Sequence, residues 1–196
     1  MRHQKYDSFG NVSAGRVFLN KELLPRFADK FKDEDKILFI GVHKYWDYAC
    51  YFNNPGKLCD FKTLDYHPGS AVTGVLKDEQ PAPDICTNIE SCDDIPEKSF
   101  DGIIMIGVYE AIKNKAQAFG HINRLLKDEG LALISVPGRG YRYLSNDCED
   151  EQSMAPQEVF EKIKPLIALE VYIVYEKETE PTSISIVCKK GVPCVS

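Results

Sequence analysis

The 196-residue sequence has no excess of positive charge, no long apolar run and no paired-cysteine motif. Its 24 lysine and arginine residues are outnumbered by 30 aspartate and glutamate residues, which gives a net charge of −6. A protein that binds a phosphate backbone needs a basic surface, so this balance argues against nucleic acid as the main partner. Because no run of 18 apolar residues occurs, no membrane span is expected. A signal peptide is not expected either, since its apolar stretch is missing.

The seven cysteines are scattered and include no Cys-x-x-Cys pair. An odd number without close pairs is typical neither of a zinc site nor of a disulfide framework, so reduced thiols are expected. The acidic pair Asp93–Asp94 offers too few oxygen ligands for a divalent cation. The prediction is a cytoplasmic protein without a metal site.

Short apolar runs of strand length recur along the chain. Continuous runs such as 100–108 and 130–136 are typical of strands buried on both faces of a parallel sheet. The last two runs are separated by only six residues, Glu-Lys-Glu-Thr-Glu-Pro, which is too short for a parallel crossover. They are therefore expected to form an antiparallel hairpin. Seven strands are predicted, over residues 36–42, 61–66, 84–89, 100–108, 130–136, 169–175 and 182–188.

Helices are predicted between these strands. Apolar residues recur at helical spacing over 21–31 and 113–126, the second ending at Asp128–Gly130, and Pro156 suits the first turn of another helix. Alternating strands and helices predict an α/β, Rossmann-like three-layer sandwich with a seven-stranded, mostly parallel sheet. Without linker or repeat, residues 21–196 are expected to form a single domain, preceded by an N-terminal arm over residues 1–20.

Ligands of an open parallel sheet bind beyond the carboxyl ends of its strands. After the first strand, Gly41 allows a tight turn and a close backbone approach, although no Gly-x-Gly-x-x-Gly cradle is present. Asp65, at the tip of the second strand, is suited to accept hydrogen bonds from two ribose hydroxyls; a helix cap or a solvated turn is the alternative. In the third loop, Asn88 is suited to an adenine edge and Ile89 to the face of its ring.

Two stretches carry a family resemblance. Residues 95–110 read Ile-Pro-Glu-Lys-Ser-Phe-Asp, then a strand, then Tyr-Glu, and residues 122–137 read Ile-Asn-Arg-Leu-Leu-Lys-Asp-Glu-Gly, then a strand. With the seven strands, the chain resembles the class I S-adenosylmethionine-dependent methyltransferases, especially their type 11 branch, over roughly residues 34–190. The resemblance implies the strand order 3-2-1-4-5-7-6 and S-adenosylmethionine as the cofactor.

The resemblance also implies residue roles. The family pattern Gly-x-Gly-x-Gly is replaced here by Gly41-Val-His-Lys-Tyr45, so the side chains of His43 and Tyr45 must point away from the cofactor or contact it. The implied cofactor contacts are Gly41, Val42 and His43 at the amino-acid end, Asp65 at the ribose, Tyr66, Asn88 and Ile89 at the adenine, and Gly107 and Val108 at the sulfonium.

Methyl transfer to a hydroxyl requires an aligned acceptor and a group that removes its proton. The two candidates for this base are Glu110, after the fourth strand, and His43, in the first loop, and Glu110 is preferred. The other interpretation of Glu110 is structural: a negative charge in the first turn of a helix interacts favourably with the helix dipole. Acceptor contacts are expected from Tyr109 and from the loop after the fifth strand, at Arg139, Tyr141 and Arg142.

The predicted function is an S-adenosylmethionine-dependent O-methyltransferase acting on a hydroxyl of a sugar, a glycan or another small molecule. The absence of a basic surface and of a large insertion that would enclose a ligand favours a glycan acceptor. Two alternatives stay open: a catalytically degenerate methyltransferase fold that serves as a binding or partner domain, and an N- or protein methyltransferase.

Overall fold

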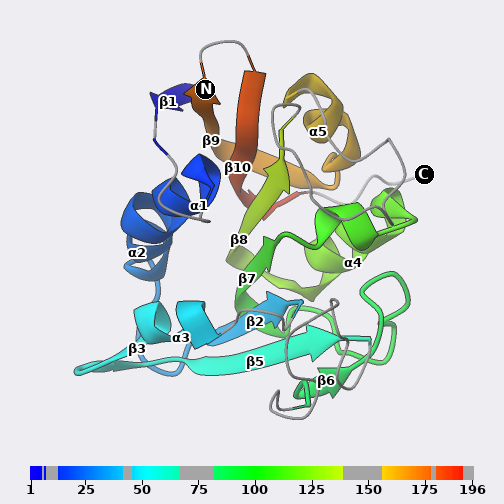
Figure 1. The fold of residues 1–196 in the computed structure, drawn as a ribbon. Helices are drawn as coiled ribbons and strands as arrows, with labels where there is room; N and C mark the ends of the chain where they lie inside the picture. Colours follow the sequence, from blue (N-terminus) through cyan, green and yellow to red (C-terminus); the bar gives the residue numbers. More distant parts are fainter. Residues whose placement is uncertain are drawn as a thin grey trace.

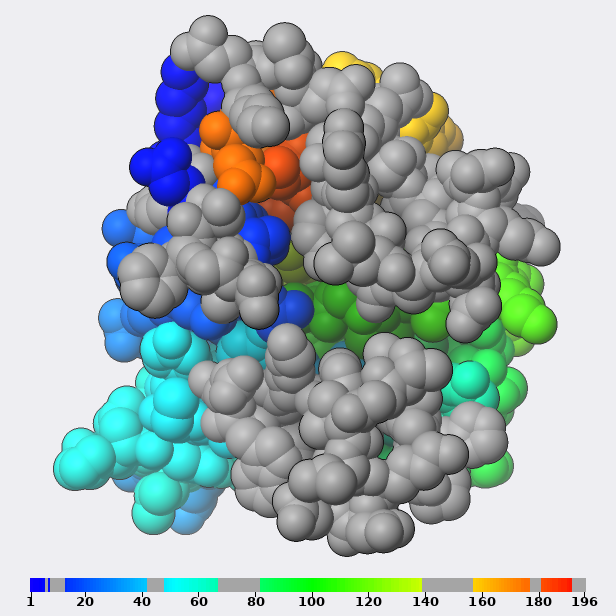
Figure 2. All heavy atoms as spheres, viewed as in Figure 1, coloured from blue at the N-terminus to red at the C-terminus, as the bar shows by residue number. Residues whose placement is uncertain are grey.

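The computed structural model describes residues 1–5, 7, 13–41, 46–66, 82–138, 156–177 and 180–191. One large sheet contains the strands β1 (Arg2–Lys5), β2 (Lys36–Ile40), β5 (Asp60–Asp65), β6 (Ile85–Cys86), β7 (Phe100–Ile106), β8 (Leu126–Pro137), β9 (Leu166–Lys177) and β10 (Glu180–Lys190). Two short strands, β3 (Asn53–Asn54) and β4 (Lys57–Leu58), form a separate hairpin that projects at one corner of the molecule (Figures 1 and 2).

The order of the large sheet is β1-β9-β10-β8-β7-β2-β5-β6 (Figure 1). Neighbouring strands from β6 to β8 are parallel, whereas β10 runs antiparallel to both β8 and β9. If the predicted strands are numbered from β2, this is the order 3-2-1-4-5-7-6. The predicted fold class, including the antiparallel hairpin, is therefore confirmed.

The helices are α1 (Ala14–Phe18), a π-helical turn (Leu19–Leu23), α2 (Leu24–Ala28), α3 (Trp46–Phe52), a 3₁₀ turn (Tyr109–Ala111), α4 (Lys115–Leu125) and α5 (Pro156–Lys162). The side chain of Ser13 caps α1 by accepting a hydrogen bond from the Arg16 amide, and Asn114 caps α4 in the same way from the Gln117 amide. None of the described helices has the length and apolar character needed to cross a membrane.

Two apolar cores lie on opposite faces of the sheet. Figure 1 shows α1, α2 and α3 on one side and α4 and α5 on the other. Strand β7 supplies both cores, because Ile103 and Met105 pack on the α4 side while Ile104 and Ile106 pack on the α1 side. Burial of both faces explains why this strand is a continuous apolar run rather than an alternating one.

Several element boundaries differ from those expected. The first helical segment begins at Ala14 instead of residue 21, and it widens into a π-helical turn just before Pro25, which has no amide hydrogen to donate. The helix predicted over 113–126 is observed as α4, which ends at Leu125, and β8 begins at once, so that Asp128–Gly130 belong to the strand and do not form a separate helix stop. Helix α3 had no counterpart in the prediction.

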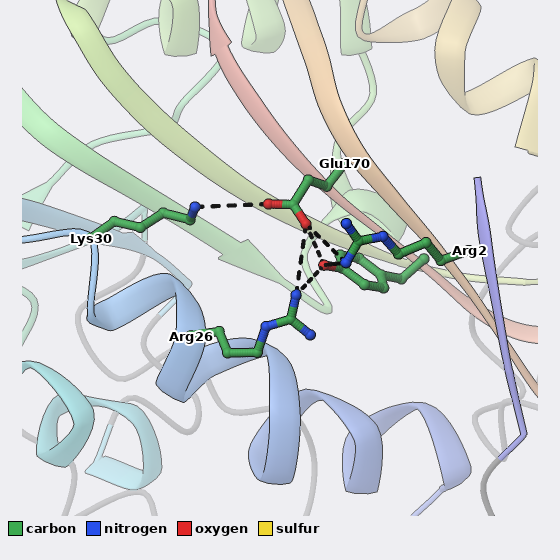
Figure 3. Close-up of polar contacts among 5 residues, drawn as sticks. Arg2, Arg26, Lys30 and Glu170 are labelled. Atoms are coloured by element: carbon green, nitrogen blue, oxygen red, sulfur yellow. Dashed lines mark hydrogen bonds and ion pairs between the residues drawn. The ribbon is translucent and has the colours of Figure 1, made fainter.

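The N-terminal residues join the fold at two places. Strand β1 pairs in parallel with β9, with Arg2 opposite Tyr172, and adds an eighth strand to the seven expected. Arg2, Arg26 and Lys30 converge on the carboxylate of Glu170 in β9 (Figure 3). The described part of residues 1–20 thus contains a sheet strand and a helix.

Candidate active site

The carboxyl ends of β2, β5 and β7 meet at one edge of the sheet. The amide of Gly41, just after β2, donates a 2.8 Å hydrogen bond to the carbonyl of Leu64 in β5, and the Thr87 amide donates to the carbonyl of Asp65 at 3.0 Å. Because the strands are parallel neighbours, the residues that follow each of them share this edge. The sheet therefore brings together Gly41, Asp65 and the turn at Gly107.

Gly41 is held in a conformation that favours glycine. Its φ is +88°, and a methyl group there would overlap Cγ2 of Val108. Gly107, next to Val108, also has a positive φ, of +64°. The turns after β2 and β7 thus pack tightly together, with the Val108 side chain against Gly41.

Asp65 and Tyr66 lie at the next strand end. The Asp65 carboxylate accepts a 2.8 Å hydrogen bond from the Tyr66 amide, which fixes the orientation of the carboxylate at the tip of β5. The Tyr66 side chain is 58% exposed. An acidic group and an exposed ring beside each other are suited to a ribose hydroxyl pair and an adjoining base.

Asn88 and Ile89 have other roles in this structure. The Asn88 oxygen accepts from the Glu90 amide at 2.9 Å, and the Glu90 carboxylate accepts from the Asn114 amide at the start of α4. Ile89 is only 4% exposed and packs in the core. The Asn88 side chain therefore stabilises its own loop, and the Ile89 side chain offers little surface to an adenine ring.

A pocket of about 60 Å³ lies on the other side of Gly107, towards β10. Because β10 is antiparallel, it begins at the edge where β7 and β8 end. This topology brings the hydroxyls of β10 next to the turn after β7. The pocket is lined by Ser13, Gly15, Arg16, Leu19, Ile106, Gly107, Glu110, Ser135, Val136, Pro137, Thr182 and Ser183.

Glu110 supplies the carboxylate of this pocket. It lies in the 3₁₀ turn after β7, and its Oε2 atom is buried with no hydrogen-bond partner among the described residues. Burial raises the pKa of the Glu110 carboxyl, while its own backbone amide and the charges of Lys115 and Arg16 act in the opposite direction. A carboxyl with a raised pKa is a stronger proton acceptor when ionised.

Arg16 of α1 is a pocket residue that the sequence analysis missed. Its guanidinium carbon lies 5.5 Å from the centre of the Tyr48 ring, and Nη2 lies 3.9 Å from where a Cβ on Gly107 would be. The signal was present, since Ser13 precedes apolar residues at 14, 17 and 18 as an N-cap precedes a helix. Gly10 and Gly15 led instead to the prediction of an N-terminal arm over residues 1–20.

Tyr109 does not line the pocket. Its side chain is fully buried, its ring centre lies 6.1 Å from that of Phe119, and Lys115 Nζ lies 4.8 Å from the ring centre. Burial, with the charges of Glu158 and Glu110, raises the pKa of the Tyr109 phenol. The 3₁₀ turn directs Tyr109 into the core, so the acceptor contact expected of its side chain is corrected to a packing role.

Five of the predicted site residues fall outside the described residues: Val42, His43, Arg139, Tyr141 and Arg142. Within the described ranges, no group of three or more His, Cys, Asp or Glu side chains is arranged to hold a metal ion.

Comparison with known proteins identifies the family. Residues 20–164 match the family described as a methyltransferase domain, which is more than half of the chain. The chain belongs to this methyltransferase domain family. A search of curated protein sequences finds no match.

Solved structures share the fold of this methyltransferase domain. A SAM-dependent methyltransferase from Aquifex aeolicus is 13% identical with a TM-score of 0.63, and the alignment covers 89% of this chain and 93% of that one. The trans-methyltransferase CalH in complex with SAH is 13% identical with a TM-score of 0.63, covering 91% of this chain and 55% of that one. The [4+2]-cyclase SpnF is 10% identical with a TM-score of 0.65, covering 98% and 87%. At these identities the likeness concerns the fold.

Proposed function

We propose that this methyltransferase domain transfers a methyl group from S-adenosylmethionine to a hydroxyl of a sugar, a glycan or another small molecule. The observation that carries the proposal is the buried Glu110 carboxylate, whose Oε2 has no partner among the described residues and which lines a polar pocket beside Gly107. Family membership supplies the reaction class, and the pocket suggests the type of acceptor.

The residues at the sheet edge fit the cofactor. The positive φ of Gly41 and its lack of a side chain would let the backbone of this turn approach the cofactor, with the Val108 side chain packed beside it. Asp65 supplies a carboxylate for the ribose, and Tyr66 an exposed ring for the adenine. Gly107 and Val108 would border the sulfonium, and Val42 and His43 the amino-acid end. S-adenosylmethionine, when bound, supplies an already activated methyl group.

Glu110 is the proposed general base. An acceptor hydroxyl in the pocket would donate its hydrogen bond to Glu110 Oε2, and this carboxylate would take the proton while the sulfur–methyl bond of the cofactor breaks and S-adenosylhomocysteine is left. The nearby positive charge of Arg16 keeps the carboxyl ionised more than burial alone would. Without such a base, a sugar hydroxyl is a weak nucleophile at neutral pH. His43 is the alternative base in the same proposal.

The pocket is suited to a neutral, hydroxylated acceptor. Four of its lining residues carry hydroxyl groups: Ser13, Ser135, Thr182 and Ser183. Hydroxyls can both donate and accept hydrogen bonds, so they match sugar hydroxyls better than aliphatic or aromatic surfaces. The net charge of −6 disfavours nucleic acid as the acceptor. Arg139, Tyr141 and Arg142 are proposed to add further acceptor contacts.

Calorimetric titration with S-adenosylmethionine and S-adenosylhomocysteine tests the cofactor site. Wild type is expected to bind both with micromolar affinity, and Asp65→Ala to lose at least about tenfold, because charge-assisted hydrogen bonds to the ribose disappear. Asp60→Ala is the matched control, since Asp60 lies at the opposite end of β5 and pairs with Lys62 at 3.4 Å. Failure of both ligands to bind the wild-type chain would overturn the proposal.

Transfer itself is tested with S-adenosylmethionine carrying a labelled methyl group. A panel of monosaccharides, glycan ends and small hydroxylated compounds is offered, and incorporation is compared between wild type and Glu110→Gln. Transfer that the Gln variant loses supports the assigned base. Cofactor binding without transfer to any member of the panel favours a degenerate, non-catalytic domain, and transfer only to amines or protein favours the N-directed alternative.

A further inference from the structure

Two residues that line the same pocket each carry a buried oxygen atom with no hydrogen-bond partner among the described residues. These atoms are Glu110 Oε2 and Ser183 Oγ, and Ser183 as a whole is only 9% exposed. Buried polar atoms in folded proteins are nearly always paired, so an unpaired one on a pocket residue indicates a ligand or water that completes it. Two such atoms around 60 Å³ indicate a ligand with two polar groups.

The neighbouring hydroxyls of β10 are already paired. Ser185, two residues further along the strand, lies 3.0 Å from the Ser135 hydroxyl, and the Thr182 hydroxyl donates to the Val174 carbonyl at 3.1 Å. Ser183 is thus the exception among three successive hydroxyl residues at this end of the strand. Its unpaired state is specific to the pocket and is not a general property of β10.

Helix α1 packs directly on Ser183, which is possible only because residue 15 is glycine. A Cβ on Gly15 would lie 2.6 Å from Cβ of Ser183 and closer still to its Oγ. Any side chain there would displace Ser183 or fill the space beside its hydroxyl. The glycine therefore lets the helix pack closely on the Ser183 hydroxyl with no side chain between them.

We propose that Ser183 is a specificity-determining residue and that the pocket takes a 1,2-diol. One hydroxyl, the one to be methylated, donates to Glu110 Oε2, and the adjacent hydroxyl is held by Ser183 Oγ. This inference rests on the proposed function, because the methylated hydroxyl is the one placed on the assigned base.

The size of the pocket and the charge of Glu110 favour a diol as the ligand. The pocket is small, at about 60 Å³, and hydroxyls on adjacent carbon atoms are the most compact pair that one ligand can present to it. An ionised carboxylate only accepts hydrogen bonds, so its partner must be a donor. Neutral hydroxyls satisfy both requirements.

The test is ligand-observed NMR with trans-cyclohexane-1,2-diol, trans-cyclohexane-1,3-diol and cyclohexanol, each at millimolar concentration, with and without S-adenosylhomocysteine. Wild type is expected to bind the 1,2-diol about tenfold more tightly than the other two, the size of effect that one neutral hydrogen bond gives. Ser183→Ala should lose this preference. Ser185→Ala, the matched control, should keep it.

Folding is checked on the same variants by thermal unfolding. Ser183→Ala removes an unpaired buried hydroxyl and should leave the Tm unchanged or raise it, whereas Ser185→Ala removes a paired one and should lower it. Gly15→Ala is a second route to the same result, because the added methyl carbon closes in on the Ser183 hydroxyl. If it folds, it should also lose the preference for the 1,2-diol.

The outcomes separate this proposal from the one on which it rests. Equal binding of the three probes, no binding of any of them, or a preference that survives Ser183→Ala overturns the diol assignment alone, provided that calorimetry shows S-adenosylhomocysteine bound. Absence of S-adenosylhomocysteine binding overturns the proposed function instead. A 1,2-diol preference that depends on Ser183 supports the assignment.

Discussion

A methyl group on Gly41 would overlap Cγ2 of Val108, so the turn after β2 and the turn after β7 pack against each other without room for a side chain. Gly41 also has a φ of +88°, which residues with a Cβ rarely adopt. This one contact joins the two strand ends that would flank the cofactor. The sequence motif contains only this first glycine of the family pattern, and its position is the one where the fold requires glycine.

Gly41→Ala is expected to destabilise the protein more than Gly56→Ala. Both glycines have positive φ, so each variant should lose about 1–2 kcal/mol to backbone strain. Only Gly41 also has a neighbour to overlap, which should add about 1–3 kcal/mol, because nothing lies within 4 Å of a Cβ on Gly56. Urea unfolding measures both values. Equal losses would show that the packing on Val108 is looser than described.

Glu110→Gln should stabilise the protein increasingly as the pH rises. Burial raises the pKa of Glu110 in the folded state, so the neutral carboxyl is favoured below the unfolded pKa of about 4.3, and this advantage disappears as the pH rises through the folded pKa. The variant stays neutral at every pH. Its free energy of unfolding should therefore match that of wild type at about pH 4 and exceed it at about pH 8.

Denaturant unfolding at the two pH values measures this difference, and the exposed Glu129→Gln serves as the control that should follow wild type. The same Glu110 variant should lose methyl transfer. A more stable and inactive enzyme would separate catalysis from folding at this position. A variant less stable than wild type at about pH 8 would contradict the burial of Glu110 Oε2 without a hydrogen-bond partner among the described residues.

The centre of the sheet was predictable because β2 and β7 are buried on both faces. The runs at β2 and β7 are continuous apolar sequences, and the strand order followed from the family resemblance around residues 95–137. Strand β1 was not predictable, since Arg-His-Gln-Lys has no apolar pattern. Instead, β1 is paired with β9 through contacts between residues far apart in the sequence, such as the ring of His3, which stacks on Tyr175 with ring centres 5.7 Å apart.

The candidate site was only partly predictable for a similar reason. Strand ends follow from the pattern of apolar runs, and so Gly41, Asp65 and Glu110 could be selected from the sequence. The direction of a side chain that follows a strand depends on the conformation of the turn. In the 3₁₀ turn after β7, the side chain of Tyr109 is buried in the core, whereas Glu110 lines the pocket. The contribution of Ser183 depends on an antiparallel strand that reaches the edge from the far end of the chain.

Arg124→Lys is expected to lower the free energy of unfolding by about 2–3 kcal/mol. In α4, the two terminal nitrogens of Arg124 donate to the carbonyls of Ile95 and Cys92 at 2.6 and 2.8 Å and so hold the loop that leads into β7. A lysine has a single nitrogen and cannot span both carbonyls, so at least one charge-assisted hydrogen bond is lost. Urea unfolding measures the change, and an unchanged midpoint would show that the pair of hydrogen bonds from the Arg124 guanidinium does not contribute to stability.

Glu170→Gln should destabilise the protein at neutral pH and much less in acid. The Tyr172 hydroxyl donates to Glu170 Oε2 at 2.5 Å, and this hydrogen bond, followed by the charges of Lys30, Arg2 and Arg26, lowers the pKa of Glu170 despite partial burial (Figure 3). A lowered folded pKa contributes stability above the unfolded pKa of about 4.3 that is lost as the pH falls through the folded value.

The expected loss for Glu170→Gln is about 1–2 kcal/mol at pH 7, since three partly exposed ion pairs and one strong hydrogen bond are weakened together. Glu161→Gln, which breaks only an exposed pair with Lys164, should change little. Thermal unfolding across the acid range, at low and high salt, measures both variants. High salt should reduce the difference in stability between wild type and Glu170→Gln, because it screens the ion pairs. The hydrogen bond from Tyr172 should account for the difference that remains. A stability difference between wild type and Glu170→Gln that does not change with pH would mean that the charge of Glu170 contributes nothing to holding β1 and α2 against β9.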